Sequence, residues 1–79
     1  MNANKFDGRI AARKRRLAEF PGEGVPPIGE ACELLCEDHV GTYALPYLCR
    51  WLDGTWQSML TGEPVTAGVV AWRISSRGI

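Results

Sequence analysis

The 79-residue chain carries nine basic and nine acidic side chains, so its formal net charge is zero, and 46% of its residues are hydrophobic. This composition excludes a wholly disordered chain, and the length leaves room for one domain, residues 1–79, with a small core. Domains of this size usually need a disulfide, a metal ion or a partner chain to support their core.

The charges are sorted along the chain. Residues 1–20 hold six basic side chains against two acidic ones, whereas residues 21–49 hold five acidic side chains and no Lys or Arg. This distribution suits a basic helix that faces either an acidic surface of its own fold or an external polyanion.

Export and membrane signals are missing from the sequence pattern. The N-terminal charge is not followed by the apolar segment of an export signal, and no apolar run approaches the ~20 residues of a membrane span. Three cysteines are an odd number, which argues against a secreted disulfide framework. We therefore expect a cytoplasmic protein with no membrane partner.

Residues 1–20 predict a basic helix. Asp7 is a suitable N-cap, and Pro21 ends the helix at about residue 20. Apolar residues follow the 3.6-residue spacing, and Arg13 interrupts this stripe. Because an isolated helix of this length is marginal in water, we expect it to dock on its own domain or on another copy. Residues 21–27, rich in Pro and Gly, are a linker.

Residues 28–40 fit two structures. For a helix, Pro27 and Gly41 are good boundary residues. For a strand, Cys32–Cys36 is a short apolar run that could pair with a returning strand over residues 42–45. We favour the strand, because residues 42–45 need a pairing neighbour.

Asp53-Gly54 lies between two alternating apolar runs, which is a strong hairpin signal. A two-residue loop there pairs Trp51 with Trp56 at a non-hydrogen-bonded position, where side chains approach most closely. We expect the two indoles to pack edge-to-face, contributing roughly 0.5–1.5 kcal/mol beyond the area they bury.

Residues 65–74 predict a long final strand. Its alternation places apolar residues on both faces, with Val70, Trp72 and Ile74 on one and Val69 and Ala71 on the other. Such a strand is central in its sheet or covered on both sides.

These elements predict an α+β fold. A basic helix over residues 1–20 and a linker over 21–27 precede a β-rich core over 28–79. This core is a small antiparallel β-meander of three to five strands that contains the Trp-rich hairpin.

Three segments resemble a group of small alphaproteobacterial proteins to which no activity is assigned. They are Cys36–Tyr43 (CEDHVGTY), Leu45-Pro46 and Val69–Arg73 (VVAWR). The resemblance covers roughly residues 33–73 and omits the basic helix. It implies a bacterial cytoplasmic protein, and no functional residue carries over from it.

Three cysteines and the single histidine are a legitimate zinc ligand set: Cys32, Cys36, His39 and Cys49. The spacing lacks a Cys-x2-Cys pair, and on a strand Cys32 and Cys36 would lie about 13 Å apart, at ~3.3 Å per residue. On a helix, Cys32, Cys36 and His39 would share a face. Buried core thiols are the commoner outcome, so we expect no metal and no cofactor.

Cys36 and His39 could instead form an activated thiol, in which the histidine makes the cysteine a nucleophile. Neighbouring carboxylates would raise the pKa of that thiol, however, and so small a domain leaves little space for a substrate pocket. We therefore expect no enzymatic activity.

Two sets of residues could contact a partner. The first is apolar and belongs to the predicted hairpin and last strand: Trp51, Trp56, Trp72, Leu48 and Leu52. The second is basic and could contact a polyanion: Arg9, Arg13, Lys14, Arg15 and Arg16. A nucleic-acid-binding domain usually has a pI above about 9, and this chain has a pI near 6.5. We therefore expect a self-associating or protein-interaction module, most simply a homodimer, with weak nucleic-acid binding as the alternative and a zinc-stabilised domain as a further one.

Overall fold

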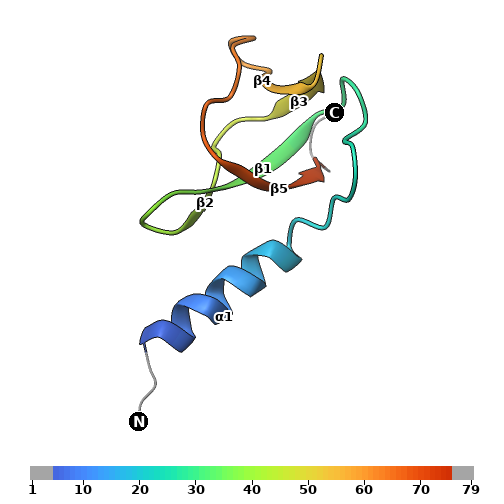
Figure 1. The fold of residues 1–79 in the computed structure, drawn as a ribbon. Helices are drawn as coiled ribbons and strands as arrows, with labels where there is room; N and C mark the ends of the chain where they lie inside the picture. Colours follow the sequence, from blue (N-terminus) through green and yellow to red (C-terminus); the bar gives the residue numbers. More distant parts are fainter. Residues whose placement is uncertain (1–4, 76–79) are drawn as a thin grey trace.

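The computed structural model describes residues 5–75, and side chains from residue 10 to residue 75. The described residues form one helix followed by a five-stranded antiparallel sheet, which confirms the α+β prediction (Figure 1). The elements are α1 Lys5–Ala18, β1 Cys32–Glu37, β2 Thr42–Ala44, β3 Cys49–Leu52, β4 Thr55–Ser58 and β5 Val69–Ile74.

The pairing of β1 with β2 confirms the strand interpretation of residues 28–40. The two strands are antiparallel, with Cys36 opposite Tyr43. The chain reverses between them because the Asp38 carboxylate accepts hydrogen bonds from the backbone N–H groups of Val40 (2.8 Å) and Gly41 (3.2 Å). This side-chain-to-backbone pattern is typical of Asp in a turn.

The sheet is strongly curved around β1. This strand pairs with β5 along one edge, and with β2 and β3 along the other, while β4 pairs with β3. The far edge of β4 is continued by the chain at Val65, whose N–H donates to the carbonyl of Trp56 (2.9 Å). Although β4 and β5 are not paired, the rings of Trp56 and Trp72 lie 6.3 Å apart. The sheet therefore curls until these two strands face each other across the core (Figure 1).

The Trp hairpin has the predicted geometry. Trp51 lies opposite Trp56, and their ring centroids are 5.1 Å apart at an interplanar angle of 69°, an edge-to-face contact. Asp53 and Gly54 have φ values of 53° and 73°. Positive φ at both central residues is what a type I′ turn requires, so the Asp-Gly pair explains the register of β3 and β4.

The last strand differs from its prediction at two points. It begins at Val69, because the preceding residues pair with β4 or turn. The register on β1 then shifts by one residue, so that Val70 is the extra residue of a β-bulge. The bulge brings Val69 onto the core beside Trp72, so the predicted assignment of these two residues to opposite faces is wrong. Val70 and Ile74 are instead 40% and 47% exposed.

Buried thiols and one indole form the centre of the core. Four buried residues form this cluster: Cys32, Leu34, Cys49 and Trp56. Partly buried side chains surround it: Leu45, Tyr47, Trp51, Val65, Val69 and Trp72. The core is thus built from the inner sides of β1, β3, β4 and β5.

The helix begins before its predicted N-cap and ends before the predicted end at about residue 20. It begins at Lys5, so Asp7 is not its N-cap, and it ends at Ala18. The side chain of Asp7 lies outside the described ones. In Figure 1 the N-terminal end of α1 points away from the sheet, and the molecule is elongated, measuring 47 × 22 × 21 Å along its principal axes.

Candidate functional site

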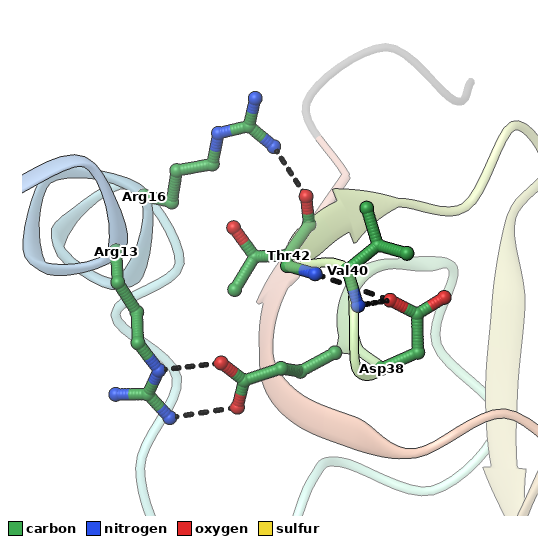
Figure 2. A network of polar contacts seen from close by, with 7 residues as sticks. Arg13, Arg16, Asp38, Val40 and Thr42 are labelled. Atoms are coloured by element: carbon green, nitrogen blue, oxygen red, sulfur yellow. Dashed lines mark hydrogen bonds and ion pairs between the residues drawn. The ribbon is translucent and has the colours of Figure 1, made fainter. Parts of the chain in front are cut away.

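The helix is anchored to the end of β1 by Arg13. Its Nε donates to Oε2 of Glu37 (2.7 Å) and its Nη2 donates to Oε1 (2.9 Å), a bidentate ion pair (Figure 2). The hydrogen bonds from Arg13 lower the pKa of the Glu37 carboxyl, and they outweigh the desolvation that would raise it. One turn further along α1, Arg16 Nη1 donates to the carbonyl of Thr42 (3.1 Å).

A second anchor follows the helix. Phe20 is 6% exposed, and the guanidinium of Arg73 lies 4.2 Å from the centre of its ring. Arg73 also binds Glu33, with Nε 2.8 Å and Nη2 2.6 Å from Oε1, and it donates through Nη1 to the carbonyl of Glu19 (2.9 Å). The chain at the end of α1 is therefore held by Arg73 of β5, which is itself paired with Glu33 of β1.

Both anchors use glutamates on the outer face of β1. On this strand Glu33, Leu35 and Glu37 alternate with the core residues and point away from them. Leu35 lies between the Glu37 anchor and the Glu33 anchor on this face. It is 0% exposed although it is not part of the core cluster.

The middle and last turn of α1 and the turn between β1 and β2 enclose a shallow cavity of about 470 Å³, here named the helix–turn hollow. Ile10 and Val40 line it, and they are 55% and 73% exposed. Its charged side chains are two of each sign, Arg13 and Arg16 against Glu37 and Asp38. The helix–turn hollow is therefore an apolar surface with a balanced charged rim.

A second cavity of about 460 Å³, here named the β2–β3 hollow, lies at the other end of β2. The connection between β2 and β3 provides most of its lining: Ala44, Leu45, Pro46, Tyr47 and Leu48. The Glu33–Arg73 ion pair completes it. Each hollow thus lies against one end of the same short strand.

The outer edge of β2 carries backbone groups that point away from β1. Leu45 N–H donates to the carbonyl of Leu34 (3.0 Å), and Asp38 N–H donates to the carbonyl of Gly41 (3.0 Å). Because antiparallel pairs alternate between bonded and non-bonded, the N–H and C=O groups of Thr42 and Ala44 must face outward. Of these four groups, the carbonyl of Thr42 accepts the hydrogen bond of Arg16.

The structure distributes the proposed zinc ligands differently from a metal site. Cys32 and Cys49 lie directly opposite each other on β1 and β3, and Cys36 is buried with them. His39 is exposed in the turn after β1. Among the described residues, no group of three or more His, Cys, Asp or Glu side chains is arranged to hold a metal ion.

The thiols have the properties of core side chains. All three cysteines are free and 0% exposed. Burial raises the pKa of each thiol, and with the added influence of the other two cysteines it raises the pKa of Cys49 to about 11. A thiol in this environment stays protonated at neutral pH, and the protonated form is a poor nucleophile.

The predicted apolar contact residues lie in or near the core. Trp56 is 8% exposed, which leaves it little surface for a partner, and Trp51 and Trp72 are half-buried against the core cluster. Leu48 and Leu52 are also half-buried. The indoles thus serve the core first, and a further role in partner binding stays a prediction.

The basic residues of α1 divide into two groups. Arg13 and Arg16 are engaged with β1 and β2, as described above. Lys14 and Arg15 are exposed, and the side chain of Arg9 lies outside the described ones. A polyanion contact through this helix stays a prediction, with two of its five residues turned toward the chain's own sheet.

Sequence reasoning missed Val40, Ile10 and the open edge of β2 as candidate surface. The available signal was an apolar residue within the polar turn Asp38–Gly41. Its meaning depends on where the turn lies relative to α1, which no local pattern describes.

Comparisons of the chain with protein-family models, with curated proteins and with solved structures found no match. Between residues 5 and 75, no helix is both long and apolar enough to cross a bilayer.

Proposed function

We propose that this chain is a non-enzymatic protein-interaction module and that its partner is a second copy of itself. One observation carries the proposal. Val40 is 73% exposed at the tip of the β1–β2 turn, beside the 55% exposed Ile10 and next to the open edge of β2. Adjacent exposed aliphatic side chains at such a place are typical of a surface that a partner covers.

The charges of this surface favour a second copy over a polyanion. The helix–turn hollow carries two positive and two negative side chains, and the strongest pair, Arg13 with Glu37, is already formed. This surface can meet a second copy of the chain, whose net charge is zero, without net repulsion. It does not offer the excess positive charge that a nucleic acid requires. Closed pairs of identical surfaces are the commonest form of association among soluble proteins.

The oligomeric state tests this function. Sedimentation equilibrium over a micromolar concentration range should show the wild-type chain as a reversible dimer. Val40→Glu should shift it to monomer, because a charge would be buried at the contact. Val25→Glu is the matched control, since Val25 is 78% exposed in the linker and lines neither hollow.

A wild-type chain that sediments as a monomer at every concentration would refute the proposal. Equal dimerisation of the Val40→Glu and Val25→Glu variants would show that the surface around Val40 is not the contact.

A further inference from the structure

We propose that the outer edge of β2 is the line along which the two copies join. Two β2 strands would pair antiparallel about a two-fold axis at Tyr43, so that Thr42 of one copy lies opposite Ala44 of the other. The result is one continuous sheet through both molecules. This inference rests on the proposed function, because it names the surface through which the second copy binds.

The backbone of β2 fits this pairing. Thr42 and Ala44 both direct their N–H and C=O groups outward, as the alternation on β1 requires. With Thr42 of one copy opposite Ala44 of the other, the outward N–H and C=O groups of the two copies face each other on both sides of the two-fold axis. The two copies would form four backbone hydrogen bonds, and Tyr43 would meet its own copy at the close, non-hydrogen-bonded position between them.

The same register matches an exposed side chain with a cavity. In an antiparallel pair centred on Tyr43, the turn carrying Val40 reaches the level of Pro46 in the other copy. Pro46 lies in the lining of the β2–β3 hollow, together with Leu45 and Leu48. Each copy has one exposed Val40 and one such hollow, so the contact forms twice, as two-fold symmetry demands.

The other edges of the sheet already have backbone partners from neighbouring segments of the chain. The N–H of Gly22 donates to the carbonyl of Trp72 on β5 (2.9 Å). On β4, the N–H of Ser58 donates to the carbonyl of Glu63 (2.9 Å). Proteins commonly cover or shorten their edge strands to prevent unwanted pairing, and β2 is three residues long. That length limits pairing to one short partner strand, which a second β2 provides.

Arg16 competes with the second copy for one acceptor. Its hydrogen bond to the carbonyl of Thr42 spans 3.1 Å and is exposed. Pairing of β2 would replace this bond by one from the N–H of Ala44 in the other copy. A single exposed side-chain bond is weak enough to be displaced by a backbone ladder.

A proline substitution tests the edge directly. Ala44→Pro removes an N–H group that points away from β1, and leaves the bond between Leu45 N–H and the Leu34 carbonyl available. The residue before it, Tyr43, is already extended, as a following proline requires. We expect the dimer dissociation constant to rise by at least about tenfold, because two inter-chain hydrogen bonds are lost per dimer. Ala44→Thr keeps the N–H and is the matched control.

Hydrogen exchange on the wild-type chain gives a second measurement that needs no variant. The amide protons of Thr42 and Ala44 should exchange freely at concentrations where the chain sediments as a monomer. They should become protected where it sediments as a dimer. This readout holds even if Ala44→Pro fails to fold.

The outcomes separate this inference from the proposed function. A monomeric wild type refutes the function and the edge pairing together. If the wild type is a dimer, two results would refute the edge pairing alone. One is that the Thr42 and Ala44 amides stay unprotected, and the other is that folded Ala44→Pro dimerises as well as Ala44→Thr.

Discussion

At the scale of single residues, an ion pair with Glu37 explains why Arg13 interrupts the apolar stripe of α1. Arg13 and Glu37 are 24 positions apart in the sequence, and Arg73 and Glu33 are 40 positions apart. Both glutamates belong to the outer face of β1, so each takes an arginine from a different part of the chain. Ion pairs at the surface are individually weak. The bidentate geometry of Arg13 with Glu37 makes that contact more specific than a single hydrogen bond.

The Glu37 carboxyl should make the stability of the chain depend on pH. Arg13 lowers its folded pKa below the ordinary value of 4.5. A carboxyl with a lowered folded pKa stabilises the fold above its ordinary pKa, and this contribution is lost as the pH falls through the folded pKa. Urea unfolding should therefore show wild type slightly more stable than Glu37→Gln at neutral pH, with the difference shrinking as the pH falls below the ordinary range of carboxyl pKa values.

An exposed acid provides the control for this measurement. Glu63→Gln removes a carboxylate whose side chain is exposed at the second turn. It should show no comparable convergence with wild type on acidification. A stability difference between wild type and Glu37→Gln that persists at low pH would mean that the ion pair is not its source.

At the scale of elements, the start of the linker is attached to β5 by one isolated β-bridge, between Pro21 and Trp72. The N–H of Gly22 bonds to β5, and its Cα lies against the face of the Trp72 ring. A β-carbon added to Gly22 would collide with ring carbons of Trp72, closer than such atoms ever approach. Glycine is therefore required here for space rather than for its backbone freedom.

Gly22→Ala should destabilise the chain by about 1–3 kcal/mol, because the ring or the linker must move to admit the methyl group. Thermal or urea unfolding followed by Trp fluorescence measures the effect. Glu23→Ala, at the exposed neighbouring position, should change the midpoint little. Equal midpoints for the two variants would show that the linker does not pack on Trp72.

At the scale of the whole molecule, the three thiols report on the integrity of the sheet. Cys32 and Cys36 lie on the central strand β1, and Cys49 lies on its neighbour β3, all fully buried. A reagent can reach them only when the sheet opens, since no cysteine belongs to a loop or an exposed edge.

Labelling with a thiol reagent at mildly alkaline pH should thus follow global unfolding. We expect negligible reaction of the folded chain, because the thiols are buried and the pKa of Cys49 is raised to about 11. Three equivalents should react at once in denaturant. Rapid labelling of one equivalent under native conditions would reveal a local opening that the compact core does not predict.

Local chemistry made part of this fold predictable. The type I′ turn needs two residues that tolerate positive φ, and Asp53-Gly54 supplies both, so the register of Trp51 and Trp56 follows from neighbouring residues alone. The strand at Cys32–Glu37 was less firmly predictable, because residues 28–40 also fit a helix, and only the need of residues 42–45 for a pairing neighbour favoured the strand.

The sequence by itself therefore determined the α+β class, the Trp hairpin and the burial of the cysteines. Only the tertiary structure decided the bulge at Val70, the partners of Arg13 and Arg73, and the exposed edge of β2. The physical reason is the separation along the chain over which each effect acts. Turn chemistry and strand alternation act between neighbours, whereas a bulge, a distant ion pair and an open edge depend on which segments meet after the sheet has curled.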